Sequence, residues 1–174
     1  MKKREIWISA VIIATAVLLL YCYSLGKGQI KIDAGGAIAT LQLRSGWLGK
    51  TTIRSQTEPT PVNSRVHKPR HLSISMQQGT NTWRLDSRGP WGKLSTIKVS
   101  NNNTTVLKLG PPFLIKPKVR KSGSRISIDF SIIGRASERY QNFARKNNRA
   151  VPAAKAKIID ETGNVLASGK FEYG

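Results

Sequence analysis

An uncharged apolar segment at the N-terminus constrains what the rest of the chain can fold into. Residues Ile6–Leu25 read IWISAVIIATAVLLLYCYSL, and Lys2, Lys3 and Arg4 stand immediately before them. At about 1.5 Å of rise per helical residue, about twenty residues span roughly the 30 Å of a bilayer's hydrocarbon core. A buried helix in a soluble core is disfavoured, because no second hydrophobic block follows to surround it. The segment therefore predicts a membrane-directed N-terminus.

Three forms of such a segment stay open. A cleavable signal peptide would use the Ser24-Leu25-Gly26 region, but the apolar stretch exceeds the usual length of about 7–15 residues and no A-x-A motif follows. A lipoprotein would acylate Cys22, although Tyr21 occupies a position where a small residue is expected. An uncleaved signal anchor fits best, since Trp7, Tyr21 and Tyr23 are placed as interfacial aromatics.

The charges beside this segment predict its orientation. Lys2, Lys3, Arg4 and the terminal amine outweigh Glu5, while Lys27 and Lys31 lie beyond the far end. This bias favours a cytoplasmic N-terminus. We therefore expect a single-pass protein of the cell membrane whose C-terminal body lies outside the cytoplasm.

The composition favours an anionic partner. Lysine and arginine number 29 against 9 aspartates and glutamates, for a net charge of +20. Such an excess predicts attraction to polyanions or anionic surfaces. The single cysteine, Cys22, excludes an intrachain disulfide, so the body needs a hydrophobic core or an oligomer.

Beyond Gly26 the apolar residues alternate with polar ones, with turn signals about every ten residues, which is typical of a β-sandwich or barrel. Residues 57–69, which contain three prolines, predict a loop with an edge strand. Residues 134–152 predict either a short helix over Glu138–Lys146 or a long connection. Strands are predicted over 30–32, 37–43, 51–54, 72–76, 82–87, 94–99, 105–109, 114–119, 125–133, 155–160, 165–167 and 171–173.

The Gly110-Pro111-Pro112 sequence predicts a boundary within the body. The expected fold class is all-β, with an N-terminal transmembrane helix followed by an antiparallel β-sandwich of one domain or two small ones. The predicted divisions are a membrane anchor over 1–26, a first β-rich domain over 29–110, and a second, immunoglobulin-like domain over 113–174.

Two segments resemble known β-sandwiches. VSNNNTTVLKLGPP, Val99–Pro112, resembles the closing hairpin of prealbumin-like or carboxypeptidase-regulatory-like domains of bacterial surface proteins, with a turn at Asn101–Asn103. KIIDETGNVLASGKFEYG, Lys157–Gly174, is similar to a strand pair of bacterial immunoglobulin-like domains, with a hairpin turn at Glu161–Asn164. These resemblances imply a sandwich fold and carry no functional residues. The Cys…Trp…Cys pattern of antibody domains is absent.

No catalytic, cofactor-binding or metal-ligating set emerges. His67 and His71 are four residues apart, but Pro69 separates them and neither cysteine nor carboxylate lies nearby in the sequence. No G-x-S-x-G nucleophile turn accompanies the serines. We therefore expect a non-enzyme without cofactor or metal. Three tryptophans, Trp47, Trp83 and Trp91, are expected either to plug the ends of the sandwich or to form a ligand platform.

A dense run of basic residues is the main candidate site. On a strand, Lys116, Lys118 and Arg120 would share one face, either as a polyanion-binding surface or as a solvated face. The full candidate set for polyanion binding is Lys116, Lys118, Arg120, Lys121, Arg125, Arg135, Arg139, Arg145, Lys146 and Arg149.

The sequence thus favours an extracytoplasmic, membrane-anchored binding or structural module. Its expected partners are the membrane itself, an anionic envelope polymer or lipid headgroups, or another protein. One alternative is an accessory domain or small hydrolase of the cell envelope, with His67 or His71 near a serine or carboxylate in a pocket. The other is a cytoplasm-facing membrane protein that binds nucleic acid. No aromatic–basic stacking motif supports nucleic acid as a partner, and an extracytoplasmic body disfavours it.

Overall fold

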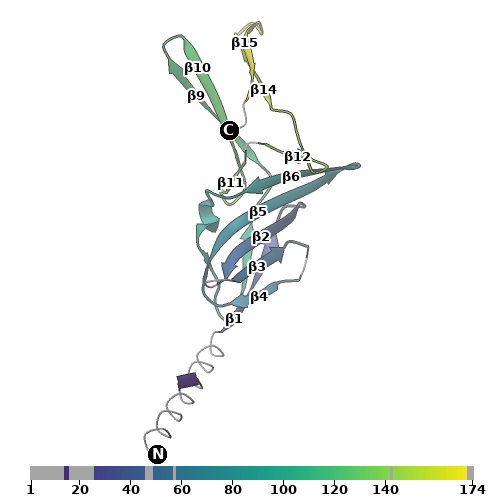
Figure 1. Ribbon diagram of the computed structural model, residues 1–174, viewed down its shortest axis with the longest axis vertical. Helices are drawn as coiled ribbons and strands as arrows, with labels where there is room; N and C mark the ends of the chain where they lie inside the picture. The colour runs from purple at the N-terminus through teal and green to yellow at the C-terminus, as the bar shows by residue number, and fades with distance from the viewer. Residues whose placement is uncertain (1–13, 16–25, 46–48, 57, 142, 172–174) are drawn as a thin grey trace, which may run out of the picture.

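The computed structural model describes residues 14–15, 26–45, 49–56, 58–141 and 143–171. Of the predicted anchor Ile6–Leu25, only Ala14 and Thr15 fall in this range, where both are helical, and the remainder lies outside the described residues. Among the described residues, no helix has the length and apolarity needed to cross a membrane. From Lys27 onward the body consists of strands with a short 3-10 helix, η1 (Gly92–Ser95), which confirms the all-β prediction (Figure 1).

The larger sheet forms one layer of the body. Its strands lie in the order β13, β12, β6, β5, β2 and β3, and β7 pairs with β5 beside this path. The bounds are β2 (Ile38–Ser45), β3 (Gly49–Arg54), β5 (Val66–Gln78), β6 (Asn81–Ser87), β7 (Ile97–Lys98), β12 (Arg145–Lys146) and β13 (Arg149–Ala150).

The smaller sheet has β1 (Lys27–Asp33) between β4 (Thr60–Asn63) and β8 (Thr104–Lys108). β4 is antiparallel to β1, but β8 is parallel to it, so the prediction of an antiparallel arrangement is wrong for this pair. The predicted hairpin at Asn101–Asn103 is also wrong, because β7 and β8 belong to different sheets. The turn instead hydrogen-bonds to the start of β1, where the Asn102 amide donates to the Lys27 carbonyl at 2.8 Å.

The two sheets share one hydrophobic core, as expected of a β-sandwich. Alternate residues of the paired strands point inward, so Ile30, Leu41, Leu43 and Leu72 are fully buried, as is Leu109 just after β8. Burial of one face of a strand explains why the period-two pattern predicted most of these strands correctly. The predicted strand over 94–99 is wrong at Leu94 and Ser95, which belong to η1, and only β7 within it is a strand.

The proline-containing segment 57–69 is only partly a loop. β4 is an edge strand as predicted, whereas residues from Val66 onward already belong to the central strand β5. Pro69 is accommodated where the ladder between β5 and β2 shifts register, between Gln42 and Leu43. A register shift removes the need for a ladder hydrogen bond from this residue, which has no N–H.

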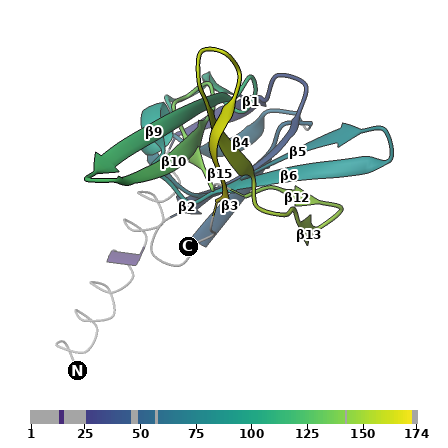
Figure 2. The same ribbon diagram turned by 90° about the horizontal axis from the view of Figure 1, so that it is seen from above.

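Two hairpins project from the sandwich at the end opposite Lys27 (Figure 1). The first joins β9 (Leu114–Ser122) to β10 (Arg125–Ile133), and β11 (Arg139–Tyr140) pairs only with the last two residues of β10. The second joins β14 (Lys155–Ile159) to β15 (Val165–Lys170). The predicted hairpin turn at 161–164 is therefore confirmed. Seen from above, β9, β10 and β15 lie over the same end of the body (Figure 2).

The chain returns to the sandwich between the two hairpins. The predicted helix over Glu138–Lys146 is wrong, because the described residues there form only the short strands β11 and β12. Ala136 and Tyr140 enter the shared core, and β12 extends the larger sheet beside β6. Part of the predicted second domain thus packs with the first, and the boundary at Gly110–Pro112 stays a prediction.

Candidate binding surface on two projecting hairpins

A buried carboxylate attaches the base of hairpin β9–β10 to the sandwich. Glu138 is 0% exposed, and its Oε1 accepts hydrogen bonds from the Gly110 amide at 2.7 Å and the Tyr140 hydroxyl at 2.8 Å. Its Oε2 accepts a third hydrogen bond from the Ala136 amide at 2.8 Å. Burial, together with the neighbouring Glu138, raises the pKa of Tyr140 far above its usual range, so the hydroxyl remains a donor.

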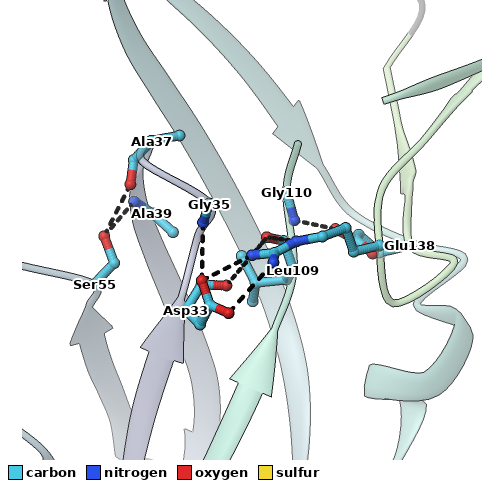
Figure 3. A network of polar contacts seen from close by, with 9 residues as sticks. Asp33, Gly35, Ala37, Ala39, Ser55, Leu109, Gly110 and Glu138 are labelled. Carbon is cyan, nitrogen blue, oxygen red and sulfur yellow. Dashed lines mark hydrogen bonds and ion pairs between the residues drawn. The ribbon is translucent and has the colours of Figure 1, made fainter. Parts of the chain in front are cut away.

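An ion pair lies beside this buried carboxylate. The Arg135 guanidinium donates to both carboxylate oxygens of Asp33 and to the Leu109 carbonyl, at distances between 2.9 and 3.3 Å. The Gly35 amide donates to Asp33 Oδ1 at 3.0 Å (Figure 3). Together these contacts join the end of β1, the end of β8 and the chain that leaves β10.

Acid should weaken this connection. The hydrogen bond from Arg135, followed by that from the Gly35 amide, lowers the pKa of Asp33 below its ordinary 3.8. The resulting stabilisation is fully present well above pH 3.8, diminishes below it, and is lost once the pH falls through the lower folded-state pKa. Thermal unfolding across this range should show wild type more stable than Asp33→Asn near neutrality, with the difference vanishing in acid. The exposed Glu58→Gln serves as control, and a difference independent of pH would contradict the assignment.

Hairpin β9–β10 has two chemically different faces. In its register Lys116 lies opposite Ser131, Lys118 opposite Asp129 and Arg120 opposite Ser127. Directly opposed residues of an antiparallel pair share a face, so these three cations lie on one face with Arg125 near the turn. All nine residues of β9 are exposed. We call Lys116, Lys118, Arg120 and Arg125 the cationic face.

The remaining predicted cations lie elsewhere. Lys121 is opposite Ile126, on the other face of the hairpin. Arg135 is engaged by Asp33, and Arg139 is half-buried in β11 with its carbonyl accepting the Ser87 hydroxyl. The others lie along the larger sheet in β12 and β13, namely Arg145, Lys146 and Arg149. The structure thus gathers about half of the predicted set on one projecting hairpin.

Sequence reasoning missed three lysines of the second hairpin, Lys155, Lys157 and Lys170, all of which are exposed. The register places Lys155 opposite Lys170 and Lys157 opposite Ser168. The alternation of Lys155 and Lys157 with Ala156 and Ile158 was the signal that could have identified them.

An apolar groove lies between the two hairpins. It has a volume of about 230 Å³ and is lined by Ile126, Ile128, Ala156, Ile158, Ala167, Ser168, Gly169, Lys170 and Phe171. Phe171, which lines the groove, meets the Phe130 ring edge to face, with centroids 4.8 Å apart. The predicted strand over 125–133 is confirmed as β10, and its Ile126 and Ile128 line this groove outside the main core.

The two histidines lie apart from the hairpins on strand β5. His67 is buried, with Nε2 2.8 Å from the Asn63 carbonyl oxygen and no hydrogen-bond partner on Nδ1. His71 Nε2 is 3.3 Å from Asp86 Oδ1, which also accepts from Arg84 at 2.9 Å. Neither histidine lines the groove between the hairpins. Within the described ranges, no three His, Cys, Asp or Glu side chains gather as a metal site.

The three tryptophans of the sequence prediction have different surroundings. Trp91 packs against the core, as expected of a residue that plugs one end of a sandwich. Trp83 on β6 lies under Lys146, whose Nζ is 5.6 Å from the ring centroid, a cation–π contact. Trp47 lies outside the described residues.

Comparisons with known proteins give no relative against which this geometry could be interpreted. No protein-family model matches the chain, and neither the curated proteins nor the solved structures contain a significant match.

Proposed function

We propose that this protein is a binding module held at the cell membrane by its N-terminal segment, with its body outside the cytoplasm. Hairpin β9–β10 contacts an anionic polymer of the cell envelope through the cationic face. The observation that carries the proposal is the placement of Lys116, Lys118 and Arg120 at alternate positions on one exposed face of a projecting hairpin.

The spacing of these cations suits a polymer with repeated negative charges. Residues two apart on a strand are about 7 Å apart, so three cations form a row along β9. Asp129, opposite Lys118, is the one carboxylate on this face of the hairpin, and the other opposed residues are serines. Such a row attracts phosphates or carboxylates along an extended chain and gains free energy from released counterions.

The position of the hairpin favours a polymer over the lipid headgroups of the anchoring membrane. The start of β1 lies at the end of the molecule opposite the two hairpins (Figure 1). With the N-terminal segment in the membrane, the cationic face would point away from it. Digestion of the body by protease added to spheroplasts would support this orientation. Protection of the body would instead favour a cytoplasm-facing protein.

A salt series tests the proposal. The full chain in non-ionic detergent micelles should bind fluorescent polyphosphate, with the logarithm of the affinity falling linearly as the logarithm of the salt concentration rises. Neutral dextran is the matched polymer and should not bind. A flat salt response, or equal binding of dextran, would remove the polyanion proposal.

A further inference from the structure

The groove between the hairpins is a second surface, separate from the cationic face. Ile126 and Ile128 of β10 form one wall, and Ala156 and Ile158 of β14 belong to the other. Because residues alternate along β10, these isoleucines point away from the face that carries Lys118 and Arg120. A ligand in the groove would therefore not occupy the polyanion site.

The strands that carry the groove's lining have unpaired edges that could accept another strand. Among the described strands, residues 125–128 of β10 pair with β9 alone, since β11 reaches only Ile132 and Ile133. β14 and β15 pair only with each other in the described part of the chain. An extended peptide can hydrogen-bond to such an edge while its alternate side chains enter an adjoining pocket.

Large apolar side chains remain exposed on the two hairpins, and Ile126 among them lines the groove. Ile126 is 48% exposed and Val165 54% exposed, even though both are large aliphatic residues. Within the described residues, seven of the eleven exposed large hydrophobics lie on these two hairpins: Leu114, Ile115, Val119, Ile126, Ile159, Val165 and Leu166. Concentrated apolar exposure of this kind is typical of interaction sites.

The charge around the groove selects an acidic occupant. Lys170 lines the groove, and Lys155 and Lys157 alternate along β14 with Ala156 and Ile158 of its wall. A second copy of this chain is disfavoured, because it brings the same cations and a net charge of +20. A lipid surface is disfavoured as well, since the isoleucines line a walled groove. The volume of about 230 Å³ is also below the roughly 300–1,000 Å³ typical of small-molecule pockets.

We propose that the groove binds an extended segment of an acidic partner protein, in which apolar and acidic residues alternate. The segment adds as a strand to the open edge of β14, and its apolar side chains enter between Ile126 and Ile158. Its carboxylates, on the other face of the added strand, meet Lys155 and Lys157. This contact is independent of the proposed polyanion site on the opposite face of β9–β10.

Synthetic peptides test this proposal. A fluorescent peptide of alternating valine and glutamate, with blocked ends, should bind the full chain in non-ionic micelles. Two control peptides should bind at least about 10-fold more weakly, as expected when apolar burial or charge pairing is lost. One alternates valine with lysine, and the other carries the same valines and glutamates in two blocks. Hydrogen exchange at residues 155–158 of β14 should slow when the first peptide binds.

A matched pair of variants locates the contact. Ile126→Glu should weaken binding of the valine–glutamate peptide at least about 10-fold, because it removes apolar surface and places a like charge in the groove. Val165→Glu introduces the same charge on the second hairpin without lining the groove, and should change the affinity less than about 3-fold. Both side chains are partly exposed, so both variants should fold, and thermal unfolding checks this.

Several outcomes would overturn the proposal. These are failure of the alternating peptide to bind, equal binding of the block peptide, or equal losses in the two variants. A loss caused by reversing Lys116, Lys118 and Arg120, with Ile126→Glu unaffected, would assign the peptide to the cationic face instead.

Discussion

Replacing Glu138 with alanine should lower the free energy of unfolding by about 3 kcal/mol or more. The substitution leaves the Gly110 amide, the Ala136 amide and the Tyr140 hydroxyl without their acceptor in a buried site. Each buried polar group left unsatisfied costs about 1–3 kcal/mol. For a chain of this size we expect the melting temperature to fall by about 6–12 °C, measured by circular dichroism on the full chain in detergent.

Two variants make this result specific. Glu138→Gln keeps the shape of the side chain but sets an amide NH₂ against one of the donors, so we expect a smaller loss of stability than with alanine. Glu161→Ala removes an exposed glutamate in the turn of β14–β15 and should leave the melting temperature nearly unchanged. Equal melting temperatures for Glu138→Ala and wild type would show that Glu138 does not hold the hairpin to the sandwich.

Reversing the cationic face should abolish most of the polyanion binding. The triple variant Lys116→Glu, Lys118→Glu and Arg120→Glu removes three cations from one exposed strand. Each cation near an anionic surface contributes about 1 kcal/mol, so the loss of three predicts an affinity about 100-fold weaker, with added repulsion on top. Titration of fluorescent polyphosphate at low salt measures the change.

A control variant with the same change in net charge tells whether weaker binding comes from the position of the lost cations or from the lower net charge. Lys50→Glu, Lys68→Glu and Lys98→Glu change the net charge by the same amount, and all three lysines are exposed on the sandwich. This control should lose less than about 10-fold in affinity, because distant surface charges are screened by salt. Equal losses in the two triple variants would mean that the whole charge of the chain, and not the hairpin, drives binding.

Local patterns predicted the strands and turns well. The alternation over Arg125–Ile133 and the turn at Glu161–Asn164 were recognisable because side chains and turn geometry depend on near neighbours. In that turn Asp160 accepts the Thr162 hydroxyl at 2.7 Å and the Asn164 amide at 2.8 Å. These hydrogen bonds lower the pKa of Asp160 and fix the hairpin locally.

Long-range relationships were not predictable from the same patterns. The parallel pairing of β1 with β8 joins residues more than seventy positions apart, and nothing local in either strand specifies the partner. Glu138 lies in a basic, polar stretch of the sequence, which gives no sign that it is buried. It is buried because Gly110, Ala136 and Tyr140 surround its carboxylate with hydrogen-bond donors. The groove likewise needs the two hairpins to lie side by side, which the apolar alternation of either one does not specify.

Hydrogen-exchange mass spectrometry of the full chain in detergent, with and without polyphosphate, tests the binding surface most directly. We predict slower exchange in β9, across residues 116–120, and no change in β3 or in residues 66–70 of β5, which also carry exposed cations. Protection spread evenly over both regions, or confined to the sandwich, would contradict the assignment of binding to the projecting hairpin.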